Sequence, residues 1–238
     1  MPEQIPDDVS RALTALAEIV YDRPDYPDVY AAITRTALEV VPGCHHAAIS
    51  VLVGGGELTA HGATSPLAQK IDDMEGELRE GPCYDAIVEE AFQMESDLTD
   101  GCTWPELGRR VLAETPVRGM IGYRIRVGSR KAGALNIFSE TPGALDERSA
   151  SIGAVLAAFA SIALGAAAHA QQAGTLREGL VSNRVIGKAT GLLMAAHGIS
   201  DEEAFQVLRR ASQELNIKLG SVAQKVLDGQ LEQVRRDQ

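Results

Sequence analysis

The clearest strand pattern in this 238-residue chain lies at residues 120–139, which read MIGYRIRVGSRKAGALNIFS. Residues 120–127 alternate between apolar and polar side chains in their second half, which is typical of a strand with one buried face. Residues 128–131 supply turn-forming residues, and residues 132–139 run back. We therefore predict a β-hairpin with strands at 120–127 and 132–139.

A second hairpin is expected nearer the N-terminus. Residues 47–53 (AAISVLV) are rich in β-branched side chains, and three consecutive glycines at 54–56 accept the positive φ angles of a tight turn. Residues 57–61 can return as the partner strand. Between the two hairpins, residues 66–112 read as short helical segments and loops around a brief apolar piece at 91–94.

Residues 1–43 read as two helices. Apolar side chains recur at helical spacing in both, and the Pro-containing segment 22–28 separates them. The first helix would carry Val9, Leu13, Leu16, Ile19 and Val20, and the second Val29, Ile33, Leu38 and Val41. Helices, hairpins and a closing helix after residues 141–143 describe an α+β domain with an antiparallel sheet. The absence of βαβ alternation disfavours a doubly wound nucleotide-binding fold.

From about residue 146 the chain reads as helices only. A long helix is expected to continue to Gly198, which suits the position just past a helix C-terminus. Ser200 and Glu203 then form a capping box for a second helix, and a third helix carries an apolar stripe around residues 222–227. Three helices in about 60 residues cannot bury a large core alone, so we expect them to pack against the long helix or against a partner chain.

Charge is distributed unevenly along the chain. The composition is that of a globular protein, with 45% hydrophobic and 23% charged residues, and the formal net charge is −11. Residues 1–170 hold 13 basic and 25 acidic side chains, whereas residues 171–238 hold 9 and 8. General attraction to polyanions is therefore excluded, and a nucleic-acid role needs a local site in the C-terminal part.

Residues 149–176 contain no Asp, Glu, Lys or Arg, a run long enough to span a bilayer. Ten of residues 150–170 are alanine, so the gain on transfer to lipid is weak, and we expect no membrane helix. The alternative is a dimer seam, formed by Ile152, Phe159, Ala166, Ala173 and Leu180 at sevenfold spacing together with Leu156, Ala163 and Ala170. The N-terminus lacks the pattern of a signal peptide and the three cysteines form no CxxC, so a cytoplasmic protein is expected.

Several blocks near the C-terminus closely resemble the ANTAR domain. They are IGKATGLLM at 186–194, GISDEEAF at 198–205, LRRAS at 208–212 and NIKL at 216–219, followed by Val222 and Ala223. The resemblance covers residues 174–231 and keeps the order and spacing of these blocks. It implies a three-helix RNA-binding antiterminator module, two copies of which engage paired stem-loops in a nascent transcript.

The first part of the chain resembles, more loosely, a GAF domain of the kind fused to ANTAR modules in actinobacteria. The residues that carry this resemblance are REGPCYDA at 79–86, Trp104-Pro105 and GALNI at 133–137. It implies a sensor domain, to which an unknown small molecule could bind, and it agrees with the α+β reading of the strand pattern.

The candidate RNA-binding residues lie on the C-terminal helices. Arg184 and Lys188 are four residues apart and share a helix face. Cations and hydroxyl donors on a compact helical unit suit phosphate contacts and a looped-out base better than a duplex groove. The predicted set is Arg184, Lys188, Thr190, Arg209, Arg210, Ser212 and Lys218. At Thr190 many family members have a longer residue. The alternative is that these cations only solvate the helices, nearly cancelled by Asp201, Glu202, Glu203 and Glu214.

Other chemistry is less well supported. Cys83 follows a proline where a helix begins, so a redox sensor or a thiol enzyme is the runner-up, against a small buried residue beside the GAF pocket. Cys44, His45 and His46 are adjacent but lack a second cluster, so no metal is expected. Trp104-Pro105 is expected to be packing. A DNA-binding helix-turn-helix is disfavoured by the net charge and by a short Gly198-Ile199 connection.

The combined prediction is a regulator without enzymatic activity or cofactor. It has a GAF sensor domain at 1–148, a long connecting coiled-coil helix for dimerisation at 149–173 and an all-α ANTAR module at 174–238. A homodimer through the 149–198 helix would bind tandem stem-loops in RNA, and a ligand in the GAF domain would shift the register of that helix.

Overall fold

The structure is a computed structural model that describes residues 26–53, 57–127 and 130–236, together with Ser10, Thr14, Ala17 and Glu18. Its contacts divide the chain into two compact units, residues 1–170 and 171–238. The division falls within one long helix, α6 (Glu147–His197). Each unit is described by itself below.

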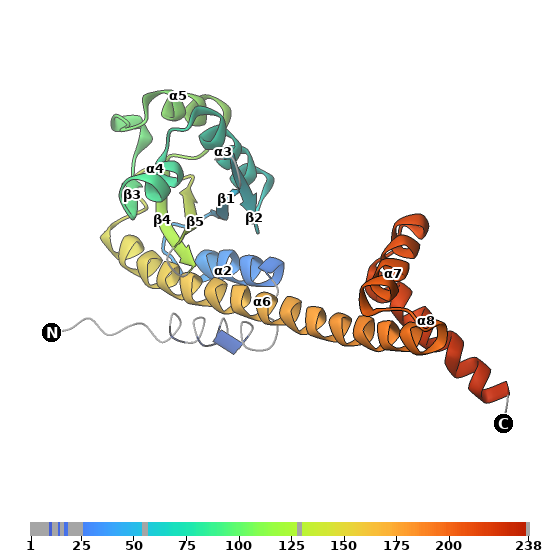
Figure 1. The fold of residues 1–238 in the computed structure, drawn as a ribbon. Coiled ribbons are helices and arrows are strands. Elements are labelled where there is room, and N and C mark those ends of the chain that lie inside the picture. Colours follow the sequence, from blue (N-terminus) through green and yellow to red (C-terminus); the bar gives the residue numbers. More distant parts are fainter. Residues whose placement is uncertain are drawn as a thin grey trace. The chain divides into compact units, whose positions relative to one another are not determined.

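The first unit contains a five-stranded antiparallel sheet with the strand order β2-β1-β5-β4-β3 (Figure 1). The elements before α6 are α2 (Tyr26–Val40), β1 (His46–Val53), β2 (Glu57–His61), α3 (Pro66–Leu78), α4 (Pro82–Val88), β3 (Phe92–Glu95), the 3₁₀ turn η1 (Leu98–Asp100), α5 (Pro105–Glu114), β4 (Gly119–Val127) and β5 (Arg130–Ser139). The predicted α+β class with an antiparallel sheet is confirmed.

Both predicted hairpins are present, as β1–β2 and β4–β5. The brief apolar piece at 91–94, to which the sequence analysis gave no secondary structure, overlaps strand β3, because residues 92–95 pair with β4 at the sheet edge. Four residues are too few to display a period-2 pattern. The apolar residues of the predicted N-terminal helix (Val9, Leu13, Leu16, Ile19 and Val20), the glycine turn at 54–56 and residues 128–129 lie outside the described residues.

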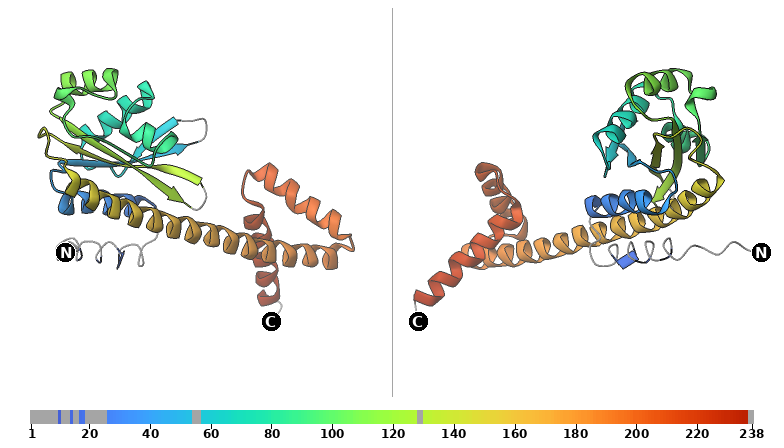
Figure 2. Two further views of the ribbon diagram at one scale, coloured as in Figure 1. Left: turned by 90° about the vertical axis from the view of Figure 1, so that its left-hand side faces the viewer. Right: turned by 180° about the vertical axis from the view of Figure 1, so that it is seen from behind.

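The sheet has a helical layer on each face, as Figure 2 shows. Helices α2 and α6 cover one face, where Ile49, Ile121 and Leu135 point into a shared core. Helices α3 and α4 cover the other face, and α5 packs against α3 in the same core, into which Met120 and Phe138 point. Adjacent residues of one strand thus serve different cores, as the alternation of strand side chains requires.

The first half of α6 belongs to the core of the first unit. Leu156, Ala160, Ala163, Leu164 and Ala167 are buried against the sheet and α2. This corrects the predicted dimer seam, in which Leu156 and Ala163 were to face a partner chain. The small side chains let the helix approach the sheet closely, which accounts for the alanine-rich composition.

Among the described residues, α6 is the one helix long and apolar enough to cross a membrane by length and composition. A helix buried in the core of a soluble protein meets the same test. The alanines and leucines of α6 that are buried against the sheet fit a core helix better than a membrane span.

The second unit packs α7 (Asp201–Leu215) and α8 (Leu219–Arg236) against the end of α6. Its core is small and centres on Ala189, Leu208, Val222 and Ala223. The predicted capping box is confirmed, since the Glu203 amide donates to Ser200 Oγ (3.3 Å) and the Ser200 amide donates to Glu203 Oε2 (2.9 Å).

Helix α6 ends as predicted, because Gly198 has φ +65°, a left-handed conformation that side chains disfavour. Residues 198–200 separate α6 from α7. A three-residue connection is long enough for a helix-turn-helix, so the loop-length argument against that motif does not hold.

Candidate functional site

The five predicted cations of the second unit, Arg184, Lys188, Arg209, Arg210 and Lys218, are all exposed. None of their five side chains has an ion pair or hydrogen bond to another residue that the structure describes. The ion pairs that the structure records among the described residues all belong to the first unit, within the range 46–140. The nearby carboxylates of Glu202 and Glu203 instead bond to Gln206 and Ser200. The positive charges are therefore available to an external anion.

Helix α6 presents a row of exposed cations beside its core-facing side. Arg177, Arg184 and Lys188 are separated by seven and four residues, spacings that keep them on one face, whereas Val185 and Ala189 pack inward. Arg177 and Arg184 both precede the quoted motif blocks, and the sequence analysis named Arg184 but not Arg177. Its sevenfold spacing from Arg184 is the sequence signal that could have found it.

A groove of about 440 Å³ lies between α6 and the start of α8. Arg177 and Lys218 contribute the positive charges, Val181 and Val185 contribute apolar surface, and Glu178 is the one carboxylate in its lining. Helix α8 begins directly after Lys218, so the positive end of its dipole also faces this region. The two cations and the helix N-terminus suit an anionic group of a ligand, and the two valines suit a flat apolar group attached to it.

Arg209 and Arg210 stand on α7 on the side away from its buried Ala204 and Leu208. Because they are consecutive residues, their side chains are about 100° apart around the helix axis and point in different directions. The structure thus gives two groups of free cations, one on α6 with Lys218 and one on α7.

Two predicted contact residues occupy other roles. Thr190 is only 4% exposed, and its hydroxyl donates to the Ile186 carbonyl (2.9 Å), so it belongs to the interior of the helical unit. Ser212 is half-buried, and its hydroxyl donates to the Ile217 carbonyl (2.6 Å) past the end of α7. The placement of Thr190 on an RNA-facing surface is therefore corrected.

Cys83 is fully buried at the start of α4. Burial raises the pKa of its thiol well above the usual range, and the carboxyls of Glu75 and Asp72 raise this pKa further. A thiolate is the reactive form of cysteine, so these surroundings oppose both redox sensing and nucleophilic catalysis at Cys83.

The Cys44-His45-His46 segment is used for structure. Cys44 is buried, the imidazole of His46 bonds to Glu140 and Ser65, and the His45 ring accepts from the Glu140 amide. No cluster suited to a metal ion occurs within the described part of the chain. Trp104 packs in the core and donates to Asp85 Oδ2 (2.6 Å), which ties α5 to α4.

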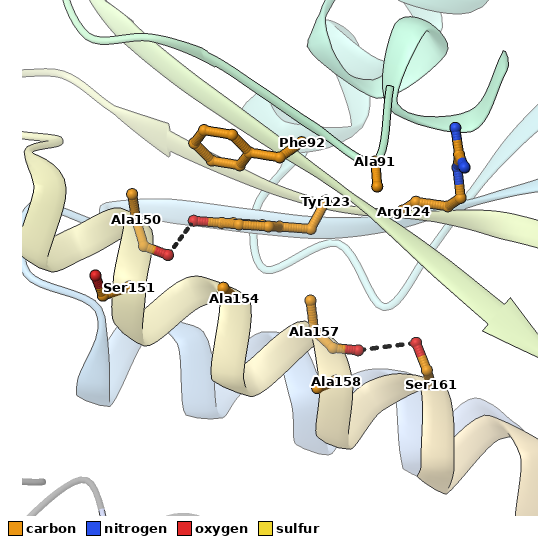
Figure 3. Close-up of a pocket in the computed structure, with 10 residues that line it drawn as sticks. All are labelled: Ala91, Phe92, Tyr123, Arg124, Ala150, Ser151, Ala154, Ala157, Ala158 and Ser161. Atoms are coloured by element: carbon orange, nitrogen blue, oxygen red, sulfur yellow. Dashed lines mark hydrogen bonds between the residues drawn. The ribbon is translucent and has the colours of Figure 1, made fainter. Parts of the chain in front are cut away.

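The first unit also has an open groove of about 520 Å³ between β4 and the first turns of α6 (Figure 3). Its floor is made of alanines of α6, and the aromatic rings of Phe92 and Tyr123 form its wall. The Tyr123 hydroxyl donates to the Ala150 carbonyl (2.7 Å) and Ser161 donates to Ala157 (2.9 Å). With these polar tips occupied, the groove offers apolar surface for a ligand and few groups for catalysis.

Solved structures show which fold the first unit has. A free methionine-R-sulfoxide reductase from Neisseria meningitidis, in complex with its substrate, is 17% identical and has a TM-score of 0.53, with 70% of this chain and 96% of that chain covered. A phycoerythrobilin-bound GAF domain from a cyanobacterial phytochrome is 12% identical (TM-score 0.53, 70% and 100% covered). The GAF domain of an Acinetobacter phosphoenolpyruvate-protein phosphotransferase is 15% identical (TM-score 0.50, 72% and 99% covered). The sheet and its flanking helices are those of a GAF fold.

The second unit is identified by its sequence. Residues 174–227 match the ANTAR domain. No curated protein matches the chain. The protein therefore combines a GAF-fold domain with an ANTAR domain.

Proposed function

We propose that this protein is an RNA-binding transcription antitermination regulator, in which the GAF domain controls an ANTAR domain that binds stem-loop RNA. The observation that carries the proposal is the set of exposed cations in the ANTAR domain, all without a carboxylate partner among the described residues. A helical surface that only needed solvation could pair its charges internally, whereas these cations have no such pair among the described residues.

The chemistry of the α6 surface favours unpaired RNA. Arg177, Arg184 and Lys188 in a row can follow a phosphate backbone, and arginine can also stack on a base. The bases of a loop are splayed out, whereas those of an RNA duplex lie in a groove that side chains cannot enter. The acidic first unit repels polyanions in general, so affinity is left to this surface.

We further propose a homodimer built along α6. Large apolar side chains remain exposed at Val155, Phe159, Ile162, Leu176 and Leu180. They fall on one heptad register of the helix, although the sequence analysis assigned the seam partly to other residues. A dimer would bring two ANTAR domains to the two stem-loops of a tandem site and bury this stripe.

Control by the GAF domain is proposed through the same helix. Helix α6 supplies buried residues to both units, Leu156 in the first and Ala189 in the second. A small molecule that favours one packing of the GAF domain would then change the register of α6 in the dimer. The open groove at Phe92 and Tyr123 is a candidate place for it. We expect such a regulator to act in the cytoplasm, without an enzymatic step.

The test is crosslinking in cells followed by sequencing of the bound RNA. The wild-type chain should recover transcripts with two adjacent stem-loops upstream of a terminator hairpin. The Arg184→Ala, Lys188→Ala double variant should lose most of this RNA, whereas Arg35→Ala, an exposed arginine of the GAF domain, should keep it. Recovery of DNA, or of RNA without stem-loops, would contradict the proposal.

A further inference from the structure

Four polar side chains meet in the interior of the GAF domain, on the face of the sheet that α3 and α4 cover. Ser50 of β1 donates to Asp72 Oδ2 of α3 (2.7 Å). Asn136 of β5 donates through Nδ2 both to Ser50 Oγ (2.7 Å) and to Asp72 Oδ1 (2.8 Å). Glu75 lies one turn further along α3. All four side chains are almost completely buried.

Glu75 holds the start of α4. Its Oε2 accepts from the backbone amides of Cys83 (2.8 Å) and Tyr84 (3.3 Å), which no side chain of α4 itself caps. Gly81 makes this approach possible, because it has φ +133° and a Cβ there would stand 2.6 Å from Glu75 Oε2. The cluster therefore links two helices and two strands.

Two buried acceptors of the cluster have no donor. Glu75 Oε1 and Asn136 Oδ1 have no hydrogen-bond partner among the residues that the structure describes. A buried acceptor without a donor is unfavourable, and buried charges are normally paired. A hydrogen atom on the carboxyl of Glu75 would turn one of these acceptors into a donor.

Among the side chains that the structure describes, no cation compensates the charge of Asp72 or Glu75. The groups that influence Asp72 and Glu75 are Asp73 on α3, Cys83, Tyr84 and Asp85 on α4, and Ser50 and Asn136 on the sheet. The cations of α3 and α5 are bound at the surface, Lys70 to Glu114, Arg109 to Glu106 and Arg110 to Glu77. Burial accordingly raises the pKa of Asp72 to about 7 and raises that of Glu75, which the charge of Asp72 raises further.

We propose that Asp72, Glu75 and Asn136 form a proton-binding site that fastens α3 and α4 to the sheet, and that losing the proton as the pH rises loosens these helices. The direction follows from linkage. The folded domain holds protons that the unfolded chain releases near pH 4, so its stability falls as the pH rises from about 4 through 7. This is opposite to the usual effect of a salt-bridged carboxylate.

The test follows unfolding of the full chain in denaturant between pH 5 and pH 9. Trp104 is the only tryptophan and lies in the core under α3 and α5, so its fluorescence reports on the GAF domain. In the wild type, the unfolding constant should rise by roughly tenfold per pH unit for each titrating carboxyl up to neutral pH. Glu75→Gln and Asp72→Asn should each flatten this slope, while Glu77→Gln, at the surface of the same helix, should leave it unchanged.

A second measurement needs no variant. Hydrogen exchange of the Cys83 and Tyr84 amides, corrected for the intrinsic effect of pH, should accelerate above neutral pH before the rest of the domain does. Equal slopes for wild type and Glu75→Gln, or unchanged protection of the two amides, would overturn the proposal. So would a gain in stability at pH 8 with potassium or ammonium chloride but not with choline chloride, because the cluster would then hold a cation.

Discussion

At the residue scale, the chemistry of a cysteine depends on its access to solvent more than on its position in a motif. Cys83 and Cys44 are buried, and burial raises the pKa of both thiols, that of Cys44 to about 12. Cys102 is partly exposed, although burial raises its pKa as well.

We therefore predict a strict order of alkylation in the folded protein. Iodoacetamide at pH 8 should modify Cys102 first and leave Cys83 and Cys44 unmodified over the same time, as peptide mass spectrometry will measure. In denaturant all three cysteines should react at similar rates, which is the control. Fast modification of Cys83 in the folded chain would restore the thiol enzyme or redox sensor as a candidate.

The free arginines of α7 support a prediction on RNA recognition. If Arg209 or Arg210 contacts a base, its replacement by alanine should cost about 1 to 3 kcal/mol of binding free energy for stem-loops recovered by crosslinking. Lys218→Ala should instead weaken all RNAs similarly and reduce the salt-dependence slope by about one. Titrations at several salt concentrations will separate the two effects. An equal loss for stem-loop and unstructured RNA in the arginine variants would exclude base recognition by these residues.

At the element scale, sequence patterns predict local structure well where the cause is local. The hairpins and the capping box at Ser200 depend on neighbouring residues, and they are confirmed. The burial of Thr190 and the packing of Leu156 depend on residues distant in sequence, and both were placed on the wrong surface. An alanine-rich helix face is compatible with either a partner chain or the sheet of its own domain, and only the fold distinguishes them.

The capping box supports a prediction for α7. Ser200→Ala removes the acceptor for the Glu203 amide and should reduce the stability of the second unit by about 1 kcal/mol. Hydrogen exchange of the first-turn amides of α7 will measure this loss. Thr175→Ala is the control, because its hydroxyl bonds only to the Gln171 carbonyl of its own exposed helix turn. Similar exchange in Ser200→Ala and wild type would show that α7 does not depend on its cap.

At the scale of the whole molecule, the two units differ in net charge and in the size of their hydrophobic cores. The GAF domain carries the surplus acid and three of the four hydrophobic clusters found among the described residues. The ANTAR domain is nearly neutral and has one small cluster. A domain with so small a core is only marginally stable by itself, so binding of RNA or of a second chain should stabilise it.

The exposed stripe of α6 provides the last prediction. Ile162 and Leu180 are each 71% exposed, so Ile162→Asp and Leu180→Asp remove little packing within one chain but place charge in the proposed dimer seam. Sedimentation should show a wild-type dimer at micromolar concentration and a monomeric double variant. Affinity for a tandem stem-loop RNA should fall to that for a single stem-loop, a loss on the order of 10² to 10⁴, because two linked contacts raise the effective concentration. The control is Val207→Asp, which charges an exposed apolar residue of α7 outside the proposed seam and should leave the dimer intact. A wild-type chain that sediments as a monomer would show that each ANTAR domain binds RNA independently, and the tandem site would then require another explanation.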